Sequence, residues 1–161
     1  MSVSAKGRIF ASHYQLVVCD DPAKFTEETN WSDADVKIGF AGNEHFRMIG
    51  TEADLNDHWV ELELTKAAPM VAEWDRITCV SLKCETGKIH VMSVIDTVPV
   101  LSVAAPIGDY SIYIAGMNIG TDQLSLGEDA ELADEELEKR CDLEWYRIFV
   151  VPGFPNKTGR L

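Results

Sequence analysis

Long apolar runs are absent from this chain of 161 residues. A helix needs about 20 consecutive apolar residues to cross a bilayer, and no stretch approaches that length. Residues 1–8 also lack the apolar h-region of a secretory signal. We therefore expect a cytoplasmic protein that has no membrane partner.

Cysteine is scarce, and none of the four cysteines forms a C-x-x-C pair. Cys79 and Cys84 differ by five positions, so in a strand they would point to opposite faces, which disfavours a shared metal ion. With no secretory signal, we expect Cys19, Cys79, Cys84 and Cys141 to be reduced thiols.

Catalytic and cofactor motifs are also missing. The sequence has no G-x-S-x-G nucleophile motif, no Walker-type loop and no dinucleotide-binding glycine motif. Its four histidines, His13, His45, His58 and His90, lie outside ligand patterns such as H-x-H or H-E-x-x-H. We therefore assign no catalytic, metal or cofactor residue.

Positive charge is in short supply: 14 basic residues face 27 acidic ones, for a net charge of -13. Such a chain would be repelled by the phosphates of nucleic acids, so direct nucleic-acid binding is not expected. The excess of acid favours either a basic protein partner or simple solubility.

What the chain does have is many short β-prone runs about ten residues apart, with turn residues between them. In Trp59–Leu64, for example, Val60 and Leu62 alternate with Glu61 and Glu63, as in a half-buried strand. The runs are 9–19, 45–51, 59–64, 76–84, 89–95, 98–103, 110–115 and 143–151. They predict an all-β domain over residues 1–161, an antiparallel β-sandwich of seven or eight strands, with 76–84 and 89–95 paired as a β-hairpin.

One short helix is predicted near residues 33–41. Ser32 suits the N-cap, and Asp35 can complete a capping box with it. Trp31 and Val36 stand at the two positions of a hydrophobic staple, so we expect the helix to close onto the sheet through Trp31. Gly39 and Gly42 are then expected to stop the helix within about two turns.

Three segments fall outside this pattern. Residues 1–8 are predicted to be a loose arm and residues 153–161 a polar tail. Residues 127–140 are predicted to be an acidic insertion, either a short exposed helix or a disordered loop.

Four short motifs occur in a suggestive order: His13-Tyr14-Gln15, Asn30-Trp31-Ser32-Asp33, Gly39-Phe40-Ala41 and Pro106-Ile107-Gly108-Asp109-Tyr110. Together, over roughly residues 12–116, they resemble the competence protein J family of small acidic nuclease inhibitors. The resemblance implies a cytoplasmic protein that binds a DNA-degrading nuclease and blocks it. It implies no catalytic residue, because an inhibitor needs none.

An acidic surface could occupy the basic groove with which a nuclease grips DNA. The candidate partner-binding residues are Glu128, Asp129, Glu131, Asp134, Glu135, Glu136, Glu61 and Glu63. Two alternatives stay open. One is a module that binds a small ligand or a carbohydrate in a groove lined by tryptophans such as Trp59 and Trp74. The other is an uncharacterised hydrolase.

Overall fold

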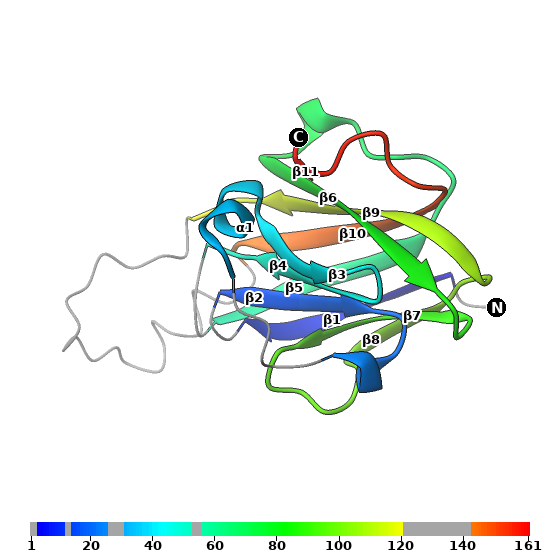
Figure 1. The fold of residues 1–161 in the computed structure, drawn as a ribbon. Helices are drawn as coiled ribbons and strands as arrows, with labels where there is room; N and C mark the ends of the chain where they lie inside the picture. The colour runs from blue at the N-terminus through cyan, green and yellow to red at the C-terminus, as the bar shows by residue number, and fades with distance from the viewer. Residues whose placement is uncertain (1–2, 12–13, 26–30, 53–55, 121–142) are drawn as a thin grey trace.

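The computed structural model describes residues 3–11, 14–25, 31–52, 56–120 and 143–161. These residues form two β-sheets that lie face to face (Figure 1). The six-stranded sheet has the order β1 (Ser4–Ala11), β5 (Asn56–Leu64), β10 (Trp145–Pro152), β9 (Gly108–Met117), β6 (Arg76–Cys84) and β11 (Gly159–Arg160). The five-stranded sheet has the order β3 (Phe40–Asn43), β4 (Phe46–Gly50), β2 (Gln15–Cys19), β7 (Lys88–Ser93) and β8 (Leu101–Ala104).

The all-β prediction is confirmed in outline, as two sheets with one short α-helix, but two of its details are wrong. Eleven strands are found in the described residues, so the predicted seven or eight is too low. The sheets are also not purely antiparallel, because β10 pairs with β5 in parallel. Among these residues, no helix is long and apolar enough to span a membrane.

The main core lies between the two sheets. Val60 and Leu62 of β5 face inward, as predicted, and pack in one cluster with Leu16 and Val18 of β2 from the opposite sheet. All four side chains are fully buried. Burying each side chain of this kind contributes about 1.5–3 kcal/mol, so the contact between the sheets is the main source of stability.

The predicted strand over residues 9–19 is in fact two strands in different sheets. β1 ends at Ala11 and β2 begins at Gln15. Tyr14, between them, has a φ of 59°, a left-handed conformation that ends a strand, and its side chain is 52% exposed rather than inward. Apolar residues continue on both sides of this corner, so their pattern does not reveal it.

The predicted hairpin of 76–84 with 89–95 is also wrong. A turn with Gly87 at φ 84° does join β6 to β7. However, β6 pairs with β9 and β11 in one sheet, whereas β7 pairs with β2 and β8 in the other. The turn residues mark a reversal of the chain, but they do not determine which strands pair after it.

The helix α1 (Asp33–Ile38) begins as predicted. The Ser32 hydroxyl accepts the Asp35 N–H (3.1 Å), and the Asp35 carboxylate accepts the Ser32 N–H (3.0 Å), which completes the capping box. Gly39 caps the C-terminus at φ 92°. The predicted extension to residue 41 is wrong, because β3 starts directly after this glycine.

The ends of the chain are more ordered than expected. The arm predicted over residues 1–8 is wrong from Ser4 onward, because β1 pairs with β5 along its whole length. Within the polar tail, β11 pairs with β6 (Gly159 opposite Cys79). The acidic insertion predicted at 127–140 lies outside the described residues.

A buried carboxylate fastens the end of β2 to the turn between β6 and β7. Asp20 is fully buried and accepts the Glu85 N–H (3.0 Å) and a hydrogen from Lys24 Nζ (3.3 Å). Its backbone carbonyl accepts the Thr86 hydroxyl (2.7 Å). Burial, with a further contribution from Asp20, raises the pKa of the Cys19 thiol to about 12, so this thiol is unreactive at neutral pH.

Asp20→Ala should lower the free energy of unfolding by about 2–3 kcal/mol, because the Glu85 N–H and the Lys24 ammonium group lose a buried, charged acceptor. Urea denaturation measures the loss. The matched control Asp33→Ala removes an exposed carboxylate from the first turn of α1, and it should cost less than about 1 kcal/mol. Equal losses in the two variants would contradict this role of Asp20.

Candidate partner-binding site

In the part of the chain that the structure describes, the acidic residues predicted to bind the partner do not form an acidic surface. Glu61 and Glu63 lie on β5, where both pair with Arg147 of β10 at 3.8 and 3.1 Å. Glu61 also accepts the Trp59 Nε1–H (3.4 Å). The two carboxylates, predicted to be exposed, are only partly exposed (35% and 25%), because the parallel strand β10 places a guanidinium between them. Their role in partner binding stays a prediction.

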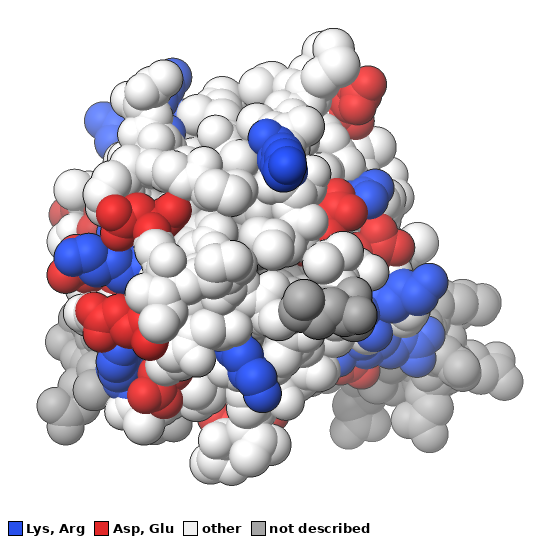
Figure 2. Space-filling model, turned by 90° about the vertical axis from the view of Figure 1, so that its right-hand side faces the viewer, with Lys and Arg blue, Asp and Glu red and all other residues white. Residues whose placement is uncertain are grey.

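The other predicted contacts cannot be placed in the structure. Glu128, Asp129, Glu131, Asp134, Glu135 and Glu136 all lie outside the described residues. Figure 2 shows one face of the molecule, on which acidic and basic side chains lie beside one another at both sides and the surface between them is mostly uncharged. No broad acidic patch is visible among the described residues on this face.

The tryptophans do not form one groove. Trp74 packs edge-on against Trp145 (ring centroids 5.5 Å apart) and Phe149 (6.0 Å), on the face of the six-stranded sheet that points away from the core. Trp31 instead packs against the five-stranded sheet, where it joins a separate cluster with Phe46 and Met48. A sugar-binding groove lined by several tryptophans is therefore not assembled in the described residues.

A pocket of about 430 Å³ lies where α1, the start of β2 and the end of β4 meet. We call it the Trp31 pocket. Its lining residues are Tyr14, Gln15, Trp31, Val36, Gly50, Thr51, Glu52 and Arg160. The Trp31 indole N–H donates to Gln15 Oε1 (3.1 Å), which fixes the ring. Parts of two motifs singled out in the sequence, around Tyr14 and Trp31, thus meet at one place.

One wall of the Trp31 pocket is charged: Glu52 and Arg160 line it, and Arg76 lies beside Glu52. Arg76 binds the Glu52 carboxylate through Nη1 and the Gly50 carbonyl through Nη2 (2.9 Å). Arg160 Nη2 lies 3.9 Å from the same Glu52 oxygen. Burial and the neighbouring Arg76 lower the pKa of Arg160, against the opposing effect of Glu52. Two guanidinium groups therefore share one carboxylate.

Behind Glu52 lies a buried histidine–glutamate pair. His58 and Glu144 are both fully buried, and His58 Nε2 is 3.4 Å from the Glu144 carboxylate. His58 Nδ1 lies 2.6 Å from the Glu144 carbonyl, which can only accept, so Nδ1 carries the proton. The other carboxylate oxygen accepts the N–H groups of Glu52 (3.2 Å) and Gly120 (3.3 Å).

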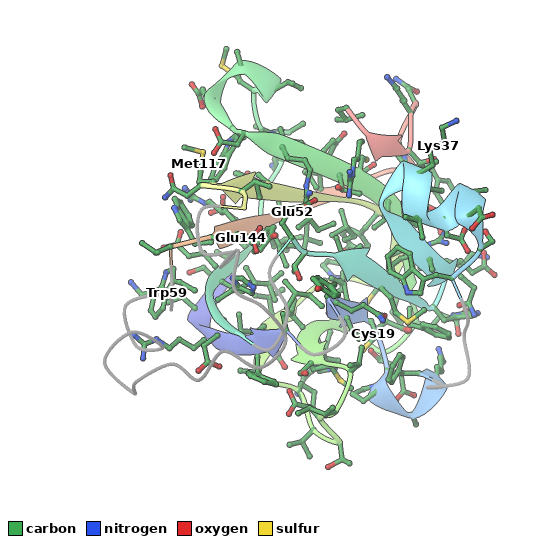
Figure 3. The ribbon with its side chains drawn as sticks, turned by 90° about the vertical axis from the view of Figure 1, so that its left-hand side faces the viewer. Cys19, Lys37, Glu52, Trp59, Met117 and Glu144 are labelled. Atoms are coloured by element: carbon green, nitrogen blue, oxygen red, sulfur yellow. The ribbon has the colours of Figure 1, made fainter. Side chains whose placement is uncertain are left out.

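Figure 3 shows Glu52 and Glu144 next to each other at one end of the six-stranded sheet. Sequence reasoning missed the His58–Glu144 pair, because the two residues are 86 positions apart. One signal was available. His58 shares the inward face of its strand with Val60 and Leu62, so it had to be buried with a partner.

The buried pair is not a metal site, because the described residues contain no group of three or more histidine, cysteine, aspartate or glutamate side chains placed to hold an ion. Its full burial also leaves a substrate no access to the histidine. What the arrangement does is hold the ends of two loops, at Glu52 and at Gly120, against β5 and β10.

Glu144→Ala should lower the free energy of unfolding by about 2–4 kcal/mol, because the backbone N–H groups of Glu52 and Gly120 lose their charged acceptor. Glu144→Gln keeps one acceptor oxygen and should cost less. Thermal and urea unfolding measure both. Glu73→Ala, at an exposed position, serves as the control and should change stability by no more than about 0.5 kcal/mol. A neutral effect of Glu144→Ala would contradict the proposed fastening.

Comparisons with known proteins give one matching family model and two solved structures with a similar fold. The family model described as Competence protein J (ComJ) matches residues 8–143. The crystal structure of ComJ from Bacillus subtilis, described as an inhibitor of the DNA-degrading activity of NucA, is 17% identical, covers 92% of this chain and 96% of its own, and has a TM-score of 0.65. A structure described as crocagin biosynthetic gene J is 15% identical, with 94% and 97% coverage and a TM-score of 0.55. A comparison with curated protein sequences gave no match.

Proposed function

Because the chain belongs to the competence protein J family, we propose that it binds a DNA-degrading nuclease and inhibits it. The family match is the observation that carries this proposal, since it spans residues 8–143 and so includes the whole five-stranded sheet together with β5, β6 and β9 of the six-stranded sheet. The shared fold adds support, because 96% of the ComJ chain can be matched to the structure of this chain. The fold alone would not be enough, because the crocagin protein shares it under a different description.

The charge of the chain suits this function. A nuclease that grips DNA presents a basic groove, and a chain of net charge -13 is attracted to such a groove over a long range. We therefore propose a basic nuclease as the partner, met in the cytoplasm. Electrostatic attraction of this kind raises the association rate and weakens as salt is added.

The acidic residues proposed to meet that groove are those between β9 and β10. Within the described part of the chain, the other two candidates, Glu61 and Glu63, are already paired with Arg147. Paired carboxylates on a sheet surface contribute little long-range attraction, since the neighbouring guanidinium cancels part of their field. The two groups of candidates should therefore differ in effect.

This difference can be measured by titrating the chain into a DNA-degradation assay with NucA and with the nuclease of the cells that make the chain. Wild-type chain should inhibit, and its association rate should fall steeply as salt rises. Changing Glu128, Asp129, Glu131, Asp134, Glu135 and Glu136 to their amides should slow association about tenfold or more.

The matched control is Glu61→Gln with Glu63→Gln, which should change the association rate by less than about threefold. Inhibition that survives high salt and all eight substitutions unchanged would contradict the electrostatic part of the proposal. A wild-type chain that inhibits neither nuclease would overturn the proposed function.

A further inference from the structure

We propose that the Trp31 pocket receives an apolar side chain accompanied by a carboxylate, presented by the partner protein. This proposal rests on the proposed function and names the chemistry of one contact within it. This contact is separate from the long-range attraction discussed above. It depends on the side chains that line and border the Trp31 pocket, where the net charge is positive although the whole chain is acidic.

The apolar part of the proposal follows from what lines the pocket. Tyr14 is 52% exposed and Val36 is 60% exposed, and both border the pocket beside the Trp31 indole. Aromatic and aliphatic side chains left uncovered around a hollow are typical of a site where a partner inserts an anchoring residue. The volume, about 430 Å³, lies within the range of about 300–1,000 Å³ found for ligand sites.

The shape of the pocket is fixed before any partner arrives. Trp31 is held by its hydrogen bond to Gln15, and it lies beside Gly50, where an added Cβ would be in ordinary van der Waals contact with the indole at 3.7 Å. A Cβ at Gly39 would be 2.7 Å from Arg160 Nε, so the arginine passes directly over the C-cap of α1. A preformed site of this kind loses less conformational entropy on binding.

The charge of the wall sets the charge of the ligand. Arg76 holds Glu52 closely and also binds the Gly50 carbonyl, whereas Arg160 lies farther from Glu52, at 3.9 Å. An incoming carboxylate could therefore pair with the Arg160 guanidinium while the Arg76–Glu52 pair stays intact. Arginine is suited to this contact, because its planar guanidinium can bind both oxygens of a carboxylate.

Other acids near the pocket do not oppose this contact. The Asp35 carboxylate accepts the Ser32 N–H in the capping box. The Glu144 carboxylate is not part of the lining, and it faces the backbone N–H groups of Glu52 and Gly120.

Glu52 is the acid of the lining, and both Arg76 and Arg160 lie near its carboxylate. These three groups together carry a net charge of +1, which favours an anion over a cation.

A side chain of a partner protein fits the pocket better than a free metabolite. Small-molecule sites usually bury 70–90% or more of their ligand. Here Tyr14 and Val36 remain more than half exposed. The Trp31 pocket is therefore shallow, and the surface of a protein would cover it better than a small molecule would.

The ligand chemistry can be tested with two small probes, 3-phenylpropionate and its neutral amide, titrated into the full chain and followed by NMR. The carboxylate probe should shift the Trp31 indole and the amides of Gly50 and Thr51, and it should bind several-fold more tightly than the amide. Arg160→Gln should remove that preference. Arg147→Gln is the matched control, since both arginines are 40% exposed and paired with glutamate, and it should change nothing.

The role of the Trp31 pocket in binding the partner can be tested by placing a negative charge in the pocket. Val36→Glu should weaken nuclease inhibition about tenfold or more, because the new carboxylate would repel the proposed one. Val98→Glu makes the same change at an exposed position, 69% accessible, in the connection between β7 and β8, and it should inhibit like wild type. Circular dichroism checks that both variants fold.

The outcomes are distinguishable. Shifts that are absent, or that are equal for acid and amide, would overturn the ligand chemistry. If Val36→Glu inhibits the nuclease as well as wild type does, the Trp31 pocket is not a partner contact, and the proposed function is unaffected. A wild type that does not inhibit would overturn the function and this use of the pocket together.

Discussion

The parallel pairing of β5 with β10 is the constraint on which the rest of the structure depends. It sets Tyr146 opposite Val60 and Arg147 opposite Glu61, and so joins parts of the chain that are far apart in sequence. Without it, β1 and β5 would be separated from the remaining four strands of the six-stranded sheet. Because a parallel pair needs a long connection between its strands, this contact is non-local, and contacts of this kind slow folding through their cost in loop-closure entropy.

The same pairing creates both polar features at the end of this sheet. It brings Glu144, directly before β10, against His58 on β5, and from there the carboxylate reaches the backbone of Glu52. Glu52 in turn connects to Arg76 and Arg160 and hence to the Trp31 pocket. The buried pair and the surface pocket are therefore two ends of one network, so loosening the first should also alter the second.

Local chemistry was predictable from the sequence wherever neighbouring residues decide it. The Ser32–Asp35 capping box and the inward face of Val60 and Leu62 follow from spacings of two or three residues, and both are present. The change of sheet at Tyr14 was hidden, because apolar residues alternate on both sides of it. The chain reversal at Gly87 was visible, but the separation of β6 from β7 was not, since the choice of partner strands depends on the whole sheet.

The candidate site divides in the same way. Tyr14 and Trp31 stood out in the sequence as parts of motifs, and the fold brings them together at one pocket. Arg160 joins them only through the pairing of β11 with β6, which no local pattern announces. Glu61 and Glu63 looked free because their partner, Arg147, reaches them only through β10.

β9 and β10 are antiparallel neighbours, with Met117 opposite Trp145. The chain therefore leaves β9 and enters β10 at the same end of the sheet. Residues 121–142, between these strands, contain nine of the 27 acidic residues and two of the 14 basic ones. Doubling the length of a loop costs only about 0.6 kcal/mol in closure entropy, so such a segment can be lengthened, shortened or recharged while the ladder keeps its register. The meeting of these two strand ends is therefore a point at which sequence can be added or removed at little cost to the folding free energy of the two sheets.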